Sequence, residues 1–213
     1  MTRSQEISIQ PTSRFLFSIA VIVLAVSLLN TIGCQSPSSN KDSGYETVAG
    51  EGLHDTDSAR KHNLIGLEAI DRDDLDKAEQ AFKNALEADV MFGPAHNNLG
   101  KVYFAKDLYY KAAWEYQYAI KLMPHHPEPK YNLGLIYESM GKINEAVDLY
   151  SDARSLEPDN PIFIGNIARA RIKRGDKGPE MRDLLTELLL KDTRPEWLAW
   201  AHEKRAMIGD TSD

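Results

Sequence analysis

An internal repeat of about 34 residues is the feature of this sequence that most constrains its fold. The segment Asn98–Tyr103 recurs as Asn132–Tyr137, with Asn, Leu, Gly and Tyr in the same places. Further matches follow at the same spacing in each copy: Ala112, Tyr116, Ala119 and Pro124, then Ala146, Tyr150, Ala153 and Pro158. A unit this short cannot bury its own apolar face, so its copies have to stack into a solenoid. The open concave surface of a solenoid usually binds another protein.

The spacing inside each copy predicts a pair of helices. Leu99 and Gly100 precede Tyr103 by four and three residues, so the three residues share one helical face. Small residues such as Gly100 allow two helix backbones to approach closely, while the tyrosines fill the gaps beside them. Pro124 ends the second helix, because proline lacks the amide donor and clashes with the preceding turn.

This pattern resembles the tetratricopeptide repeat, a pair of antiparallel helices marked by Trp, Leu-Gly, Tyr, Ala, an aromatic residue, Ala and Pro. The two copies keep every mark except Trp, which is His96 in one and Lys130 in the other. One unit earlier the match is partial, and one unit later Ile167 and Ala168 replace Leu-Gly. The resemblance implies an all-α, right-handed superhelical solenoid over residues 58–192, with three clear units and a degenerate fourth.

Residues 193–213 are expected to form a capping helix and a tail. Arg194-Pro195-Glu196 is typical of a helix start. A repeat array needs a cap because its last unit would otherwise expose its stacking face. Six apolar side chains are available to cover that face: Trp197, Leu198, Trp200, Ala201, Ala206 and Met207. The two tryptophans form a docking patch in the alternative interpretation.

Residues 1–33 have the layout of a secretory signal. Arg3 and Arg14 precede an apolar segment at 15–29, and the only cysteine of the chain, Cys34, follows. The arrangement is similar to a bacterial lipoprotein signal, in which the cysteine is lipidated and becomes the first residue of the mature protein. An uncleaved membrane anchor with an incidental thiol is the alternative.

Residues 34–57 are rich in Ser, Gly, Asn and Asp and are predicted to form a flexible tether after the lipidated cysteine. Arg3 and Arg14 keep the amino-terminal side in the cytoplasm, so we expect the repeats outside it, in the periplasm of a bacterium. Gln35 follows the cysteine where Asp often signals inner-membrane retention, which slightly favours the outer membrane.

Charge and motifs argue against several other classes of protein. The net charge is −7 and no stripe of Lys and Arg is present, so nucleic acid is not an expected partner. No catalytic or phosphate-binding motif occurs, so we expect no enzyme activity, no catalytic residue and no cofactor.

Two features that could suggest a metal site have simpler interpretations. His62 and His96 occupy equivalent positions, but two ligands make a poor metal site, and we expect them to be structural. The acidic run at 71–76 lacks the glycine and the closing glutamate of a calcium loop. We expect it to be the turn between two helices.

The resemblance places partner-binding residues on the first helix of each pair, which lines the concave groove in this family. Asn98, Asn132 and Asn166 recur there once per repeat, and two roles are open for them. A ladder of carboxamides can hydrogen-bond an extended peptide, or it can brace neighbouring helices. The groove residues carried over by register are Arg60, Asn63, Leu67, Asn97, Asn98, Lys101, Phe104, Tyr131, Asn132, Leu135, Glu138, Asn166 and Arg169.

Some members of this family clamp a carboxy-terminal carboxylate with Lys, Asn and Arg at five positions. In this sequence only Asn98 agrees with that set, and Glu128 would repel a carboxylate. Capture of a chaperone tail is therefore not expected, and an amphipathic helix or extended segment suits the mixed groove better.

These inferences predict a membrane-anchored, non-enzymatic adaptor that holds a protein or peptide partner, in cell-envelope or pilus-type assembly. A self-associating structural scaffold, paired through Trp197 and Trp200, is the alternative.

Overall fold

The structure, a computed structural model, describes residues 54–208. The predicted signal peptide, Cys34 and most of the predicted tether lie outside the described residues, as do residues 209–213. The described residues form nine helices: α2 (Thr56–Asp71), α3 (Leu75–Ala88), α4 (Gly93–Ala105), α5 (Tyr109–Leu122), α6 (Pro127–Ser139), α7 (Ile143–Leu156), α8 (Pro161–Arg174), α9 (Pro179–Lys191) and α10 (Pro195–Met207).

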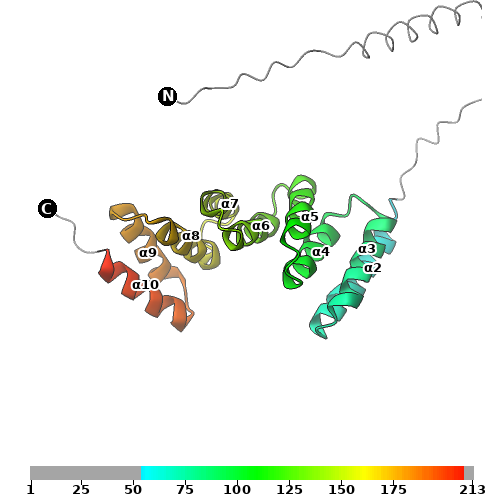
Figure 1. Cartoon of the computed structure of the whole chain (residues 1–213), viewed down its shortest axis with the longest axis horizontal. Coiled ribbons are helices and arrows are strands. Elements are labelled where there is room, and N and C mark those ends of the chain that lie inside the picture. The colour runs from blue at the N-terminus through cyan, green and yellow to red at the C-terminus, as the bar shows by residue number, and fades with distance from the viewer. Residues whose placement is uncertain (1–53, 209–213) are drawn as a thin grey trace, which may run out of the picture. The chain divides into compact units, whose positions relative to one another are not determined.

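The helices form antiparallel pairs that follow one another in a row (Figure 1). The pairs are α2–α3, α4–α5, α6–α7 and α8–α9, and each first helix also packs against the preceding second helix. The predicted all-α solenoid of tetratricopeptide type is confirmed. The first helix, α2, begins at Thr56, two residues before the expected boundary, because the Asp55 side chain accepts a hydrogen bond from the Ser58 amide.

The turn between the two helices of a pair has the same geometry in every unit. Asp73, Asp107, Gly141 and Gly175 occupy the same place in successive repeats, and all have positive φ, between 57° and 96°. Each donates its amide to the carbonyl three residues back, at 2.9–3.1 Å. Glycine adopts this conformation freely, and aspartate is one of the few other residues that tolerate it. The acidic run at 71–76 thus spans the end of α2, the helix–helix turn at 72–74 and the start of α3, which agrees with the predicted turn.

Glycine against an aromatic ring sets the distance between the helices of a pair. A Cβ added to Gly100 would lie 2.7 Å from the Tyr116 ring, and one added to Gly134 would lie 2.5 Å from the Tyr150 ring. Gly66 and Phe82 repeat this contact in the first pair. All three rings are fully buried.

The last helix, α10, starts one repeat length after α8 and packs on α9, so it takes the place of a fifth first helix. Ala201 is buried, and Trp197, Leu198 and Trp200 are half-buried, which agrees with the predicted cap. The expectation was wrong for Ala206 and Met207, which are exposed. They follow Ala201 by five and six residues, so they lie away from its face of the helix.

None of the helices within residues 54–208 combines the length and the apolar character that crossing a bilayer requires.

Leucine in place of Gly134 should destabilise the fold, because the new side chain would overlap the buried Tyr150 ring. We expect G134L to lower the free energy of unfolding by about 1–3 kcal/mol. Alanine should cost less, since it favours a helix over glycine by up to about 1 kcal/mol. Thermal unfolding followed by circular dichroism measures both changes, with the exposed Ser139→Ala in the same helix as control. A G134L chain as stable as the unmodified one would contradict this account of the packing.

Candidate protein-binding face

The first helices lie side by side and form one face of the solenoid. Among the first three pairs, α2 contacts α4 and α4 contacts α6, whereas the second helices of successive pairs do not touch to a similar extent. The first helices are therefore the inner row of the array. All residues that the sequence placed in the groove belong to this row.

Asparagines brace the inner row from one unit to the next. The Asn98 side-chain amide donates to the Asn63 side-chain oxygen at 2.9 Å, and that of Asn132 donates to Asn97 at 3.0 Å. Asn166 donates to the Tyr131 hydroxyl at 3.4 Å and to the Ile162 carbonyl at 2.7 Å. Of the two roles considered for this ladder, bracing is the one that the contacts show; binding of a peptide stays a prediction.

The groove residues differ in how far they are available to a partner. Asn63, Asn97, Asn98 and Asn166 are buried, so they contribute mainly to the scaffold. The exposed members are Arg60, Leu67 and Lys101. The half-buried members are Phe104, Tyr131, Asn132, Leu135, Glu138 and Arg169. Cationic, aliphatic and aromatic side chains are thus presented along one row.

Glu138 joins the third unit to the fourth. One of its oxygens accepts hydrogen bonds from the Arg169 guanidinium at 2.9 Å and the Tyr150 hydroxyl at 2.8 Å. The other accepts from Lys173 and from Arg169 Nε at 3.2 Å. The Glu138 side chain is only 6% exposed, although the residue as a whole is half-buried, and two cations face one anion. Glu138 therefore stabilises the contact between the two units, and the side chains around it carry a net positive charge. Its position in the sequence did not indicate this role.

The same contacts control the ionisation of Glu138. Burial by itself raises the pKa of this carboxyl, but hydrogen bonds from Arg169, Lys173 and Tyr150 outweigh burial and bring the pKa to about 2. Burial and the carboxylate together raise the pKa of Tyr150, so its hydroxyl remains a donor at neutral pH.

The end of the inner row is closed by the tryptophans of α10. The Trp197 ring lies against Gly165, where a Cβ would approach it to 2.7 Å. The guanidiniums of Arg169 and Arg194 stack on this ring, with 5.7 Å and 4.8 Å to its centroid. A hollow of about 230 Å³ beside it is lined by Arg169, Glu196, Trp197 and Trp200. The tryptophans thus both cap the array and border a surface hollow.

His96 is held inside the second unit. Its ring nitrogens lie 2.7 Å from a Glu115 carboxylate oxygen and 2.9 Å from the Val90 carbonyl oxygen. The ring also stacks on Tyr118 at 5.3 Å between centroids. These contacts agree with the structural role expected for this residue. His62, at the equivalent position, is half-buried.

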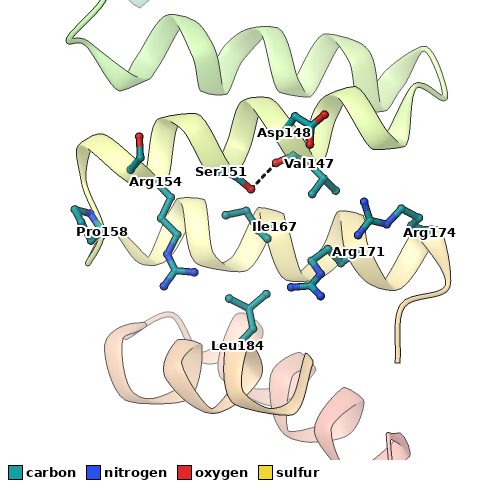
Figure 2. A pocket seen from close by; sticks show the side chains of 10 residues that line it. Val147, Asp148, Ser151, Arg154, Pro158, Ile167, Arg171, Arg174 and Leu184 are labelled. Carbon is teal, nitrogen blue, oxygen red and sulfur yellow. Dashed lines mark hydrogen bonds between the residues drawn. The ribbon is translucent and has the colours of Figure 1, made fainter. Parts of the chain in front are cut away.

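A larger hollow of about 520 Å³ lies outside the inner row, among α7, α8 and α9 (Figure 2). Arg154, Arg171 and Arg174 surround it together with Ser151, whose hydroxyl donates to the Val147 carbonyl at 2.7 Å. Arg154 pairs with Glu187, and the other two arginines pair with Asp176. Each of these three arginines already pairs with a carboxylate, so the hollow offers no unpaired arginine to an anion.

Comparisons with known proteins agree with this architecture. Residues 127–160 match the Tetratricopeptide repeat family. Protein bimA of Emericella nidulans is 32% identical over 91 residues, which is 43% of this chain and 11% of bimA. This chain therefore spans about a tenth of that relative's length.

Solved structures show the same fold at low sequence identity. The first TPR of Spaghetti (RPAP3), bound to the HSP90 peptide SRMEEVD, has a TM-score of 0.56 at 19% identity, covering 59% of this chain and 100% of that one. MamA has a TM-score of 0.55 at 23% identity, covering 70% of this chain and 81% of that one. At such identities the likeness establishes the fold alone.

Replacing Glu138 by glutamine should destabilise the junction of the third and fourth units in a pH-dependent way. The folded-state pKa is depressed, so the stabilisation is present above the unfolded pKa near 4.5 and is lost as the pH falls toward 2. We expect E138Q to cost about 2–3 kcal/mol at pH 7 and progressively less below pH ~4.

Thermal unfolding of both chains between pH 7 and pH 3 measures this difference. The exposed Glu145→Gln serves as the matched control, since it removes the same charge without touching the network. A constant difference between E138Q and the unmodified chain across this range would contradict the assigned role of the carboxylate.

Proposed function

We propose that this tetratricopeptide-repeat protein is a membrane-anchored, non-enzymatic adaptor that holds a protein or peptide partner against its inner row of helices. The observation that carries the proposal is the composition of that row. It presents exposed cations and half-buried apolar side chains on a scaffold whose buried asparagines are already bonded to one another. A protein-protein interaction domain of tetratricopeptide type needs such a preformed surface.

The charge of this face indicates the character of the partner. The chain as a whole is acidic, with a net charge of −7. On the inner row, Lys101 is exposed, and Glu138 is outnumbered by Arg169 and Lys173, while the exposed Glu128 leaves one acidic position at the start of α6. A segment that alternates acidic and apolar side chains would complement this surface, as an amphipathic helix or an extended strand.

Capture of a carboxy-terminal carboxylate is not part of the proposal, although the Spaghetti structure holds an HSP90 peptide. Asn63 and Asn98, two of the five positions that would form such a clamp, are buried and bonded to each other. Leu67 and Glu128 occupy two more of these positions, and neither can donate a hydrogen bond to a carboxylate.

The anchoring half of the proposal rests on the sequence of residues 1–34. A basic start, an apolar segment and a single cysteine support a lipidated Cys34 on the outer side of a bacterial plasma membrane or in the periplasm, with the outer membrane slightly favoured. An adaptor tethered in that place suits cell-envelope or pilus-type assembly. No catalytic motif or cofactor signature in the sequence argues for enzyme activity.

A self-associating scaffold of the envelope is the second candidate. The half-buried Trp200 beside the hollow at the end of the array favours it, because a second chain's side chain would fit there. Light scattering of W200A and the unmodified chain distinguishes the two: only a scaffold paired at this end changes its mass.

Photo-crosslinking in cells expressing the full chain tests the adaptor proposal. With p-benzoylphenylalanine at Phe104, in the inner row, we expect a discrete adduct to another protein, which mass spectrometry would identify. The exposed Lys83 on α3 is the control position, because α3 is a second helix and faces away from the row. Equal adducts at both positions, or none at Phe104, would contradict partner binding at this face.

Labelling with palmitate tests the anchor. The unmodified chain should incorporate the label and sediment with membranes, whereas C34S should lose the label. An unmodified chain that sediments with membranes but carries no label would indicate an uncleaved apolar anchor at 15–29 instead. Label retained by C34S would contradict lipidation of Cys34.

A further inference from the structure

Three aromatic side chains form an exposed stripe on α5, the second helix of the second unit. Tyr110, Trp114 and Tyr118 are four residues apart, so they share one face of the helix. Their exposed fractions are 81%, 61% and 39%. The rings of Trp114 and Tyr118 are in contact, with centroids 5.4 Å apart. Single exposed apolar residues are common on proteins, but a contiguous row of rings marks an interaction surface.

The repeat fold does not require these rings. The equivalent positions one repeat earlier, on α3, are Asp76, Gln80 and Asn84. Those one repeat later, on α7, are Asn144, Asp148 and Asp152. Both neighbouring units therefore fold with polar side chains at all three positions, and the aromatic stripe is specific to α5.

The stripe is symmetric in its rings and opposite in its charges. Tyr110 and Tyr118 lie four residues on either side of Trp114, and Asp107 and Lys121 lie seven residues on either side. Asp107 and Lys121 are both exposed. Lys121 lies in α5, two helical turns after Trp114, and Asp107 lies in the turn just before α5, so the two charges flank the stripe at its opposite ends. A two-fold axis at Trp114 that sets two α5 helices antiparallel would place Tyr110 opposite Tyr118, and would bring the Asp107 turn of one copy toward Lys121 of the other.

We infer that the occupant of this stripe is a second copy of the chain, paired α5 to α5 in antiparallel orientation about a two-fold axis at Trp114. An isologous contact needs a surface that is complementary to itself, and the Asp107–Lys121 pair occurs twice in this arrangement. A parallel arrangement would place Asp107 against Asp107 and Lys121 against Lys121, so the charges select the antiparallel one.

The size of the stripe sets the strength of the pair. The exposed parts of the three rings equal nearly two whole aromatic side chains, or roughly 300–450 Å² per chain. Stable complexes bury about 1,200–2,000 Å² in total, so this contact belongs to the weak, reversible class. A hollow of about 290 Å³ beside the stripe leaves room for a ring of the partner copy, and its lining residues are Tyr103, Tyr110, Lys111, Trp114 and Glu115.

This surface is separate from the proposed adaptor face. The stripe lies on a second helix, whereas the adaptor face consists of first helices, so one chain can use both surfaces at once. It is also separate from Trp197 and Trp200, which belong to α10. The inference therefore does not depend on the proposed function.

Photo-crosslinking of the purified full chain in nonionic detergent locates the contact. With p-benzoylphenylalanine at Trp114 we expect an adduct of twice the chain mass, crosslinked to α5 of the second copy, in a yield that rises with concentration. The same photo-residue at Asp148, the equivalent position on α7, should give no such adduct. Crosslinks that map outside α5, or equal yields at the two positions, would overturn the inference.

A charge exchange tests the antiparallel register with the same readout. D107K and K121D should each lower dimer formation about tenfold, because each places like charges opposite one another twice. The double variant should restore it, and so should an equal mixture of the two single variants, since every 107–121 pair is then of opposite sign. Association driven by the detergent micelle would be the same in all samples, and that outcome would overturn the inference. Because Asp107 has a positive φ of 58°, lysine there also strains the turn before α5. Circular dichroism and thermal unfolding of each variant detect this effect, and K121D, whose position lies within α5, tests the charge pairing without it.

Discussion

Within each of the first three pairs, the close approach of the two helices depends on a glycine that faces an aromatic ring. Gly100 and Gly134 lie so near the rings of Tyr116 and Tyr150 that no Cβ fits between them. Each pair is the platform on which the next first helix packs, so every contact further along the array depends on this one. In the fourth pair, Ala168 and the buried Leu184 occupy these positions. Alanine is larger than glycine and leucine is smaller than tyrosine, so the exchange conserves the packed volume.

Contacts between units differ more than contacts within them. Asparagines brace the first three units in a uniform way, with a carboxamide donating to the residue 35 positions earlier. At the junction of the third and fourth units, the Glu138 cluster adds a buried carboxylate with two cations and a hydroxyl. Breaking such a cluster leaves a buried charge without its partners, so removing Glu138, Arg169 or Lys173 should destabilise this junction.

The exposed positions of the repeat carry the side chains that differ from one unit to the next. Along the inner row these are Lys101 and Leu67, and on the opposite helices they are the rings of the α5 stripe. His96 links the two sides of the second unit, since it bonds Glu115 and stacks on Tyr118 of α5 from its place in α4. Because packing constrains only the buried positions, the two faces can serve different partners on one scaffold.

The fold followed from the sequence because its determinants are local and repeated. The regular spacing of Gly, Tyr and Pro predicted the helix pairs, their stacking and the capping helix, apart from the exposure of Ala206 and Met207 at its end. The shared positive φ of Asp73 and Gly141 was also readable from the repeat, since only aspartate and glycine occur at that position, but the signal was missed.

The roles of the polar residues could not be predicted from the repeat pattern. A carboxamide on the inner row can donate to a peptide or to its neighbour, and the placement of Asn63 beside Asn98 shows the contact with the neighbour. From the sequence, Glu138 was expected to be a groove residue available to a partner. In the structure, Arg169, Lys173 and Tyr150 from two other helices donate hydrogen bonds to its carboxylate. The architecture could be predicted from the sequence, since helix periodicity and repeat length are properties of the chain. Which polar groups bond within the scaffold could be seen only in the folded chain, because hydrogen bonds and ion pairs depend on distances between residues far apart in the sequence.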